Sequence, residues 1–345
     1  MSEENLEDRL PTPPNVQRSV VMFIITLCSV YLVYGFQWAG GNPLTDATIA
    51  WESVQFASAL MLILLCHELG HYFVAKKHGF ELSVPYFLPF PFAFGTLGAV
   101  IHLKSLPKSR TALLEMGAAG PIAGFIVTAL CIVLDAARTQ NHHQVQLSGS
   151  YEEYIGTIEM LPEPSQWEIV LNTILGITPP NMEAISLMIM EDPLLMRWLN
   201  GIILTEPLSP FAELGPIAFA GWVGCLITSI NLLPIGQLDG GHIMNAFLPH
   251  QARRISKGVL GAVFVFGILT WKGWMVWATL LWFMRANEPI MVPKHSTFTL
   301  RSKLIGIISI VVFGLCVMAE PIYDVQVSVS EIEWVDDMDV DEQRR

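Results

Sequence analysis

The sequence predicts an all-α polytopic membrane protein with about six to seven transmembrane helices and a membrane-associated re-entrant loop or β-hairpin. Of its 345 residues, 52% are hydrophobic and only 14% are charged, whereas soluble domains carry roughly 25% charged residues. Three uncharged stretches are each long enough to cross a bilayer: Ser19–Thr45, Met116–Leu134 and Leu214–Leu238. Composition and stretch length together exclude an ordinary soluble protein.

The predicted elements follow the chain in order. Residues 1–18 are polar and contain three prolines, and no small-residue cleavage site follows the first apolar run, so we expect a cytoplasmic tail rather than a cleaved leader. A membrane region is expected over 19–319 and an acidic tail over 320–345. The expected spans are Ser19–Trp38, Ser53–Ala75, Ala112–Leu134, Leu214 into the irregular stretch 231–241, Val259–Trp271, Trp274–Met284 and Leu304–Ala319.

The segment Leu82–Leu103 is uncharged but cannot form an ordinary helix. It is interrupted by Pro85, Pro89, Pro91, Gly95 and Gly98. Its backbone groups would lack hydrogen-bond partners in lipid, so the segment must pair with itself or with neighbouring helices. We therefore expect a re-entrant loop or a short hairpin here.

Two interpretations of the region from Val259 to Met284 differ in topology. One long tilted helix would bury Lys272 near mid-membrane, whereas a helical hairpin would place it at an interface beside two tryptophans, where aromatic residues prefer to lie. With the N-terminus inside, the basic segments after the second and fourth spans are cytoplasmic, and the insert 135–208, with ten acidic and two basic residues, lies outside. The hairpin returns the basic segment 285–303 to the cytoplasm and the acidic tail to the outside, so seven spans are favoured.

Charge and cysteine usage exclude two other classes of function. The formal net charge is −12, whereas a nucleic-acid-binding protein shows a basic face, so no nucleic-acid partner is expected. The five cysteines lie in apolar runs without CxxC spacing, which argues against a thiol metal site or a disulfide framework.

The second span ends with the sequence His67-Glu68-Leu69-Gly70-His71. Histidines four residues apart lie on one helix face, so both imidazoles can bind one Zn²⁺. Glu68 then lies beside the metal as a candidate general base, the role that this motif serves in metalloproteases. Ionisable groups at membrane depth are costly, which favours a functional interpretation over a purely structural one.

A catalytic zinc takes three protein ligands, so a further ligand must come from elsewhere in the chain. The strongest candidate is Asp239, which follows 25 uncharged residues in a stretch broken by one proline and three glycines. Broken backbone at membrane depth is tolerated where it lines a cavity. The predicted topology brings Asp239 to the same side of the bilayer as His67 and His71. The alternative is a helix-stop residue at the membrane surface.

The two motifs together resemble the site-2 protease family of intramembrane zinc metalloproteases. The third-ligand motif of that family, N-x-x-P-x-x-x-x-D-G, is matched by Asn231, Pro234, Asp239 and Gly240. The resemblance covers about Ser53–Pro289, and three further segments look like the plant and cyanobacterial branch: Phe94–Ala99, Ala119–Gly124 and Arg285–Pro289. Many members insert a PDZ domain between the motifs, but the insert 135–208 is too short for a comfortable PDZ domain with linkers.

The resemblance implies the roles of the site residues. His67, His71 and Asp239 would bind one Zn²⁺ per chain, Glu68 would act as the base, and Asn231 would lie near the substrate backbone or the oxyanion. We also assign Pro234, Gly95 and Gly98 to the substrate-binding region. The segment that contains the two glycines offers either a strand edge for an unwound substrate or a purely structural hairpin. For Asn231 the substrate role is favoured over that of a plain helix terminator.

We therefore expect a multi-pass zinc endopeptidase that cleaves the transmembrane segments of single-pass, membrane-anchored substrates, as in regulated intramembrane proteolysis. Its partners would be those substrates and the lipid bilayer, which in a bacterium is the plasma membrane, and its active site would lie nearer the cytoplasmic face. One alternative is a prenyl-protein-type membrane zinc peptidase, against which Asp239 argues. The other is a non-proteolytic metal-binding or transport protein, against which Glu68 argues. The sequence leaves the substrate and the oligomeric state open.

Overall fold

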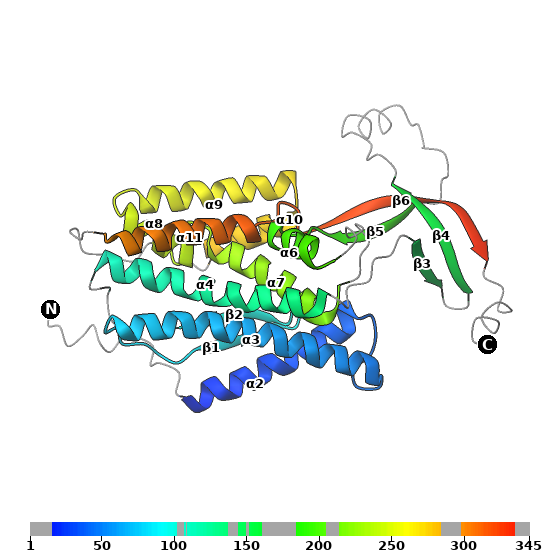
Figure 1. Ribbon diagram of the computed structural model, residues 1–345, viewed down its shortest axis with the longest axis horizontal. Helices are drawn as coiled ribbons and strands as arrows, with labels where there is room; N and C mark the ends of the chain where they lie inside the picture. The colour runs from blue at the N-terminus through cyan, green and yellow to red at the C-terminus, as the bar shows by residue number, and fades with distance from the viewer. Residues whose placement is uncertain are drawn as a thin grey trace.

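A computed structural model describes residues 16–101, 107, 109–136, 144–149, 152–160, 184–204, 214–283 and 298–334. It contains a bundle of helices with a small sheet at one end (Figure 1). The helices are α2 (Val16–Val33), which continues as a π-helical turn (Tyr34–Trp38), α3 (Ala47–Lys77), α4 (Arg110–Asp135), α6 (Leu194–Ile203), α7 (Pro216–Asn231), α8 (Asp239–Phe247), α9 (Ala252–Leu269), α10 (Lys272–Phe283) and α11 (Leu300–Cys316).

Each predicted span contains a helix, and three of the described helices are long and apolar enough to cross a membrane. These are Val16–Trp38, Ala47–Lys77 and Arg110–Asp135. Side chains cap two of them: Asp46 accepts hydrogen bonds from the first backbone N–H groups of α3, and Ser109 accepts one at the start of α4. Most of the predicted N-terminal tail, residues 1–15, lies outside the described residues.

The broken segment after α3 forms a β-hairpin. Strand β1 (Tyr86–Pro89) pairs antiparallel with β2 (Thr96–Val100), with Tyr86 opposite Val100. Gly95, at φ +83°, forms part of the turn, and the indole of Trp38 donates a 2.8 Å hydrogen bond to the carbonyl of Ala93 at its tip. The hairpin packs against α2 and α3. This outcome confirms the hairpin among the two predicted possibilities, because the two strands satisfy each other's backbone groups.

The two short apolar segments near the C-terminus form a helical hairpin rather than one helix. Helix α9 ends at Leu269, α10 begins at Lys272, and the two pack side by side. Gly267 permits the close approach, since a Cβ there would meet the backbone of Met275. The indole of Trp274 donates a 2.9 Å hydrogen bond to the carbonyl of Ala319, which fixes the turn at the sheet end of the bundle.

A four-stranded antiparallel sheet departs from the predicted all-α fold. Its strands are β3 (Gln144–Gly149), β4 (Glu152–Met160), β5 (Ala184–Met190) and β6 (Ile322–Trp334), in the order β3-β4-β6-β5. The C-terminal segment, which we predicted to be an acidic tail, therefore supplies a strand between two strands of the insert. Valine alternates with polar residues along 325–329, the pattern of a strand with one apolar face.

The core lies where α3, α4 and α7 pack together. Its large, fully buried side chains include Phe56, Leu60, Leu114, Ile132 and Trp222. Large apolar side chains also cover the outside of the bundle: Leu134 of α4 is 73% exposed, Leu269 of α9 76% and Ile310 of α11 70%. Apolar surface of this extent marks contact with a membrane, which identifies an integral membrane protein.

Candidate metal centre

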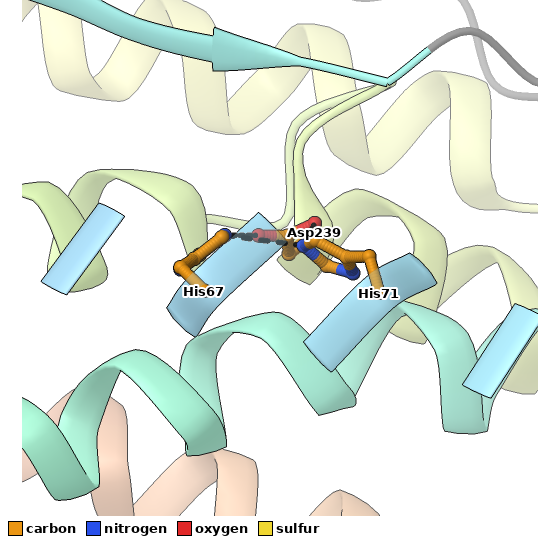
Figure 2. A group of neighbouring side chains, drawn as sticks. All are labelled: His67, His71 and Asp239. Carbon is orange, nitrogen blue, oxygen red and sulfur yellow. Dashed lines mark hydrogen bonds and ion pairs between the residues drawn. The ribbon is translucent and has the colours of Figure 1, made fainter. Parts of the chain in front are cut away.

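Three predicted metal ligands from two distant parts of the chain meet inside the bundle. His67 and His71 lie on one face of α3, and Asp239 is the first residue of α8 (Figure 2). The Asp239 carboxylate oxygens lie 3.1 Å from His67 Nε2 and 3.2 Å from His71 Nε2. The two Nε2 atoms are 3.1 Å apart. The His67 side chain is 6% exposed and those of His71 and Asp239 are 13% exposed, so solvent reaches the cluster only from the side of the latter two.

A backbone carbonyl of α4 orients the second histidine. His71 Nδ1 lies 2.8 Å from the carbonyl oxygen of Met116, which can only accept a hydrogen bond. Nδ1 therefore donates to that oxygen, which leaves Nε2, the nitrogen that faces Asp239, as the one available to a metal. Hydrogen bonds of this kind fix the tautomer and the ring orientation of histidine ligands in metal sites. The sequence contained no signal for Met116, because its side chain takes no part.

Small residues of α4 make room for the cluster. A Cβ on Gly120 would collide with the His71 ring, and one on Gly124 would lie 3.2 Å from His67 Cβ. Across the same interface, a Cβ on Gly70 would lie 2.5 Å from the carbonyl oxygen of Ala119. The Ala119–Gly124 segment, noted in the sequence only for its family resemblance, is thus the surface against which both histidines pack.

We expect Gly120→Ala to weaken metal binding at this cluster. The added methyl group would overlap the His71 ring, so the ring must leave its place beside Asp239. Overpacking of this kind costs about 1–3 kcal/mol, and if the whole cost falls on the metal-bound state zinc binding weakens about 5- to 150-fold. The measurement is zinc affinity by competition with a chromophoric chelator.

Gly261→Ala on α9 is the matched control, since a Cβ there meets nothing within 4 Å. It should bind zinc as the wild type does. Equal affinities for Gly120→Ala and Gly261→Ala would contradict the packing account.

The loop between α7 and α8 brings Asp239 to the cluster. Gly240 lies so close to the carbonyl of Leu232 that a Cβ would collide with it, and a Cβ on Gly241 would lie 2.5 Å from the carbonyl oxygen of Ile235. Gly236, at φ +39°, donates a 2.8 Å hydrogen bond from its backbone N–H to the Ser256 hydroxyl oxygen. The glycines therefore let the loop fold tightly enough for α8 to begin beside α3.

The candidate base, Glu68, follows His67 on α3 and is 8% exposed. Within the described part of the chain, its carboxylate makes no hydrogen bond. The titratable groups that interact with its carboxylate are the two histidines and Asp239. A buried carboxylate beside the cluster, with its oxygens uncommitted, can accept a proton from a reactant at that place.

The predicted substrate-binding residues do not form one group. Asn231 is the last residue of α7 and Pro234 lies in the loop that leads to Asp239, so both belong to the segment that carries a ligand. Gly95 instead packs on α2, where a Cβ would lie 2.4 Å or more from backbone atoms of Val30. Gly98 lies in β2 with open space at its Cα.

The donor set fits a zinc ion. Imidazole nitrogens and a carboxylate are ordinary zinc ligands, and atoms bound at about 2.0–2.2 Å in tetrahedral geometry lie roughly 3.3 Å apart. The three pairs here are separated by 3.1–3.2 Å. Each of the three residues offers one free ligand atom, and no other group of this kind occurs among the described residues.

Comparison with known proteins agrees with this donor set. A family model for peptidase family M50 matches residues 55–271, which include both motifs. "Probable zinc metalloprotease EGY2, chloroplastic" of Oryza sativa subsp. indica is 27% identical over 278 residues, 77% of this chain and 42% of that protein. The EGY1 protein of Arabidopsis thaliana, of the same description, is 28% identical over 208 residues, 59% of this chain and 31% of that protein.

A third relative, "Probable zinc metallopeptidase EGY3, chloroplastic" of Arabidopsis thaliana, is 24% identical over 284 residues, 81% of this chain and 44% of that protein. The chain thus spans less than half the length of these curated relatives. No solved structure matches it significantly. The Arg285–Pro289 segment, which the sequence resemblance included, lies outside the described residues.

Proposed function

The chain belongs to peptidase family M50, and from this premise we propose that it is an intramembrane zinc endopeptidase that cleaves transmembrane segments of single-pass substrates. The observation that carries the proposal is the convergence, at 3.1–3.2 Å, of Asp239 with His67 and His71, two histidines of a helix long enough to cross a bilayer. We assign these three residues as the zinc ligands and Glu68 as the general base.

The proposed chemistry divides between the metal and the protein. His67, His71 and Asp239 would hold a zinc ion, which when bound would supply Lewis-acid chemistry toward the scissile carbonyl and water. Glu68 accepts the proton of the attacking water and delivers it to the leaving amine. Met116 keeps His71 in the tautomer that binds metal through Nε2. The buried surroundings of Glu68 exclude bulk water that would compete for its carboxylate.

The depth of the ligand cluster in the membrane supports a substrate whose cleaved segment is apolar. His67 lies nine residues before Lys76, the first basic residue at the end of α3, or about 14 Å along the helix axis. A substrate helix must unwind before its backbone can react, because its carbonyl and N–H groups are otherwise bonded to each other. Asn231, whose amide can bond to both backbone groups, ends α7 on the segment that carries Asp239, and we propose that it holds the unwound substrate.

We further propose seven spans, with the insert and the C-terminal strand on the same side of the membrane. Strand β6, which follows the last span, pairs with β4 and β5 of the insert, and paired strands cannot lie on opposite sides of a bilayer. An even number of crossings must therefore separate the insert from β6. Helices α7, α9, α10 and α11 provide four, whereas a single helix in place of α9 and α10 would leave three.

Cysteine labelling tests this topology. Single cysteines are introduced at Ser186 in β5, Ser328 in β6 and Lys257 near the start of α9, in a background without the five native cysteines. A membrane-impermeant maleimide applied to sealed, oriented vesicles should label Ser186→Cys and Ser328→Cys from one side and Lys257→Cys only from the other. Labelling of the two strand positions from opposite sides would rule out the seven-span arrangement.

The prenyl-protein-type alternative needs a glutamate as third ligand. Among the described residues, the only group of candidate ligands around His67 and His71 contains Asp239. That observation favours the proposed endopeptidase over this alternative. The other alternative, a metal-binding transport protein, needs no general base. Loss of cleavage on substitution of Glu68 would therefore separate the endopeptidase from it.

A further inference from the structure

Arg110, the first residue of α4, forms hydrogen bonds with the C-terminal end of α8, the short helix that begins with Asp239. Its Nε donates a 2.6 Å hydrogen bond to the carbonyl of Ala246, and its Nη2 donates a 2.7 Å hydrogen bond to the carbonyl of Phe247. The last carbonyls of a helix have no partners within it, and the negative end of the helix dipole favours a cation there. The planar, forked guanidinium can satisfy both carbonyls at once.

Besides the two carbonyls, the Arg110 guanidinium contacts an aromatic ring. The guanidinium lies over the ring of Phe298, 5.1 Å from its centroid, and the rings of Phe298 and Phe247 are 4.8 Å apart. Gly306 of α11 leaves room for the Phe247 ring, since a Cβ there would lie 2.9 Å from it. Arg110 thus joins α4, α8 and the segment before α11 at one point.

The same helix that carries Arg110 also holds the histidine side of the cluster. Met116 of α4 orients His71, and Gly120 receives its ring. Gly117 of α4 approaches α8 directly, because a Cβ there would lie 3.2 Å from the carbonyl oxygen of Asp239. Helix α4 therefore contacts both parts of the ligand set, the histidines of α3 and Asp239 of α8.

We propose that Arg110 is a positioning residue for the metal centre: by clamping the end of α8 to α4, it fixes Asp239 relative to His71. Helix α8 has nine residues, about 13 Å of helix, so it moves as a rigid piece. Its first turn has no side-chain cap, whereas its last turn is held by the two hydrogen bonds from Arg110. This inference rests on the proposed zinc function and adds a residue that touches neither metal nor substrate.

The test compares zinc and cobalt binding by the full-length wild type, Arg110→Met, Arg110→Lys and the control Arg254→Met. Arg254 is an exposed arginine at the start of α9. We expect Arg110→Met to bind zinc about 10–100-fold more weakly, in the range found for residues that orient metal ligands. Its Co²⁺ complex should lose intensity in the visible ligand-field bands, which report tetrahedral coordination. Arg110→Lys should fall between, since lysine keeps the charge but not the fork.

Several outcomes would overturn the inference. One is an Arg110→Met protein with wild-type zinc affinity and cobalt spectrum, even if it melts at a lower temperature, because Arg110 would then serve stability alone. If Arg110→Met does not fold, wild-type affinity and spectrum in Arg110→Lys overturn it equally. If Arg254→Met weakened zinc binding as much as Arg110→Met, that result would also overturn the inference. If the wild type itself binds no zinc, the proposed function fails, whereas a zinc-binding wild type with an unaffected Arg110→Met removes only this inference.

Discussion

Glu68→Gln is expected to lose cleavage of a membrane substrate while it keeps its zinc. Glutamine has the same shape as glutamate but cannot take a proton from water, so the ligands stay in place and proton transfer fails. Loss of a general base costs about 10²–10⁴-fold in rate. The measurement is turnover of a single-pass model substrate by purified protein in liposomes, with the zinc content of the same preparation determined by mass spectrometry.

Glu52→Gln provides the control for this experiment, because Glu52 is a partly exposed glutamate on the same helix, 16 residues before Glu68. It should cleave as fast as the wild type. A Glu68→Gln protein that keeps both its zinc and its cleavage rate would remove Glu68 from the mechanism. A protein that loses both would mean that Glu68 helps to hold the metal.

Asp239→Ala is expected to lose zinc and, with it, all cleavage. The two histidines remain on α3, but one of the three protein ligands is gone. Structural zinc sites bind with about 10–16 kcal/mol shared among four ligands, so one ligand contributes roughly 3 kcal/mol, or on the order of a hundredfold in affinity. The measurement is zinc affinity by chelator competition.

Asp239→Glu tests whether the position of the carboxylate matters as well as its presence. It keeps the carboxylate but moves it by one methylene, so it should retain more zinc than the alanine variant and less than the wild type. Full zinc affinity in Asp239→Ala would show that another residue completes the site, and the convergence seen between α3 and α8 would then have no metal-binding role.

The helices and the ligand cluster could be predicted from sequence because their signals are local. Long uncharged runs predicted α2, α4 and α7, and histidines four residues apart necessarily share a helix face. Asp239 was predicted because an acid after a long uncharged run is conspicuous. Local patterns left two questions open: whether Leu82–Leu103 forms a re-entrant loop or a hairpin, and whether Val259–Met284 forms one helix or two. The structure was needed to answer both.

The contacts that shape the cluster could not be predicted because they are long-range or involve backbone atoms. Arg110 bonds to carbonyls 136 and 137 residues away, and nothing in its neighbours indicates this. Met116 acts only through its carbonyl. The sheet was missed for another reason: its strands come from segments that looked like an insert and a tail, and strand β6 carries its alternating valines among many acids.

The most direct test of the account is to map the cleavage site in a substrate with one transmembrane segment. The substrate is reconstituted with wild type or Glu68→Gln, with and without a zinc chelator, and its fragments are identified by mass spectrometry. We predict a cut within or at the edge of the apolar segment, made only by the wild type, abolished by the chelator and restored by added zinc. Cuts confined to the soluble parts of the substrate, or the same cut made by Glu68→Gln, would contradict the account.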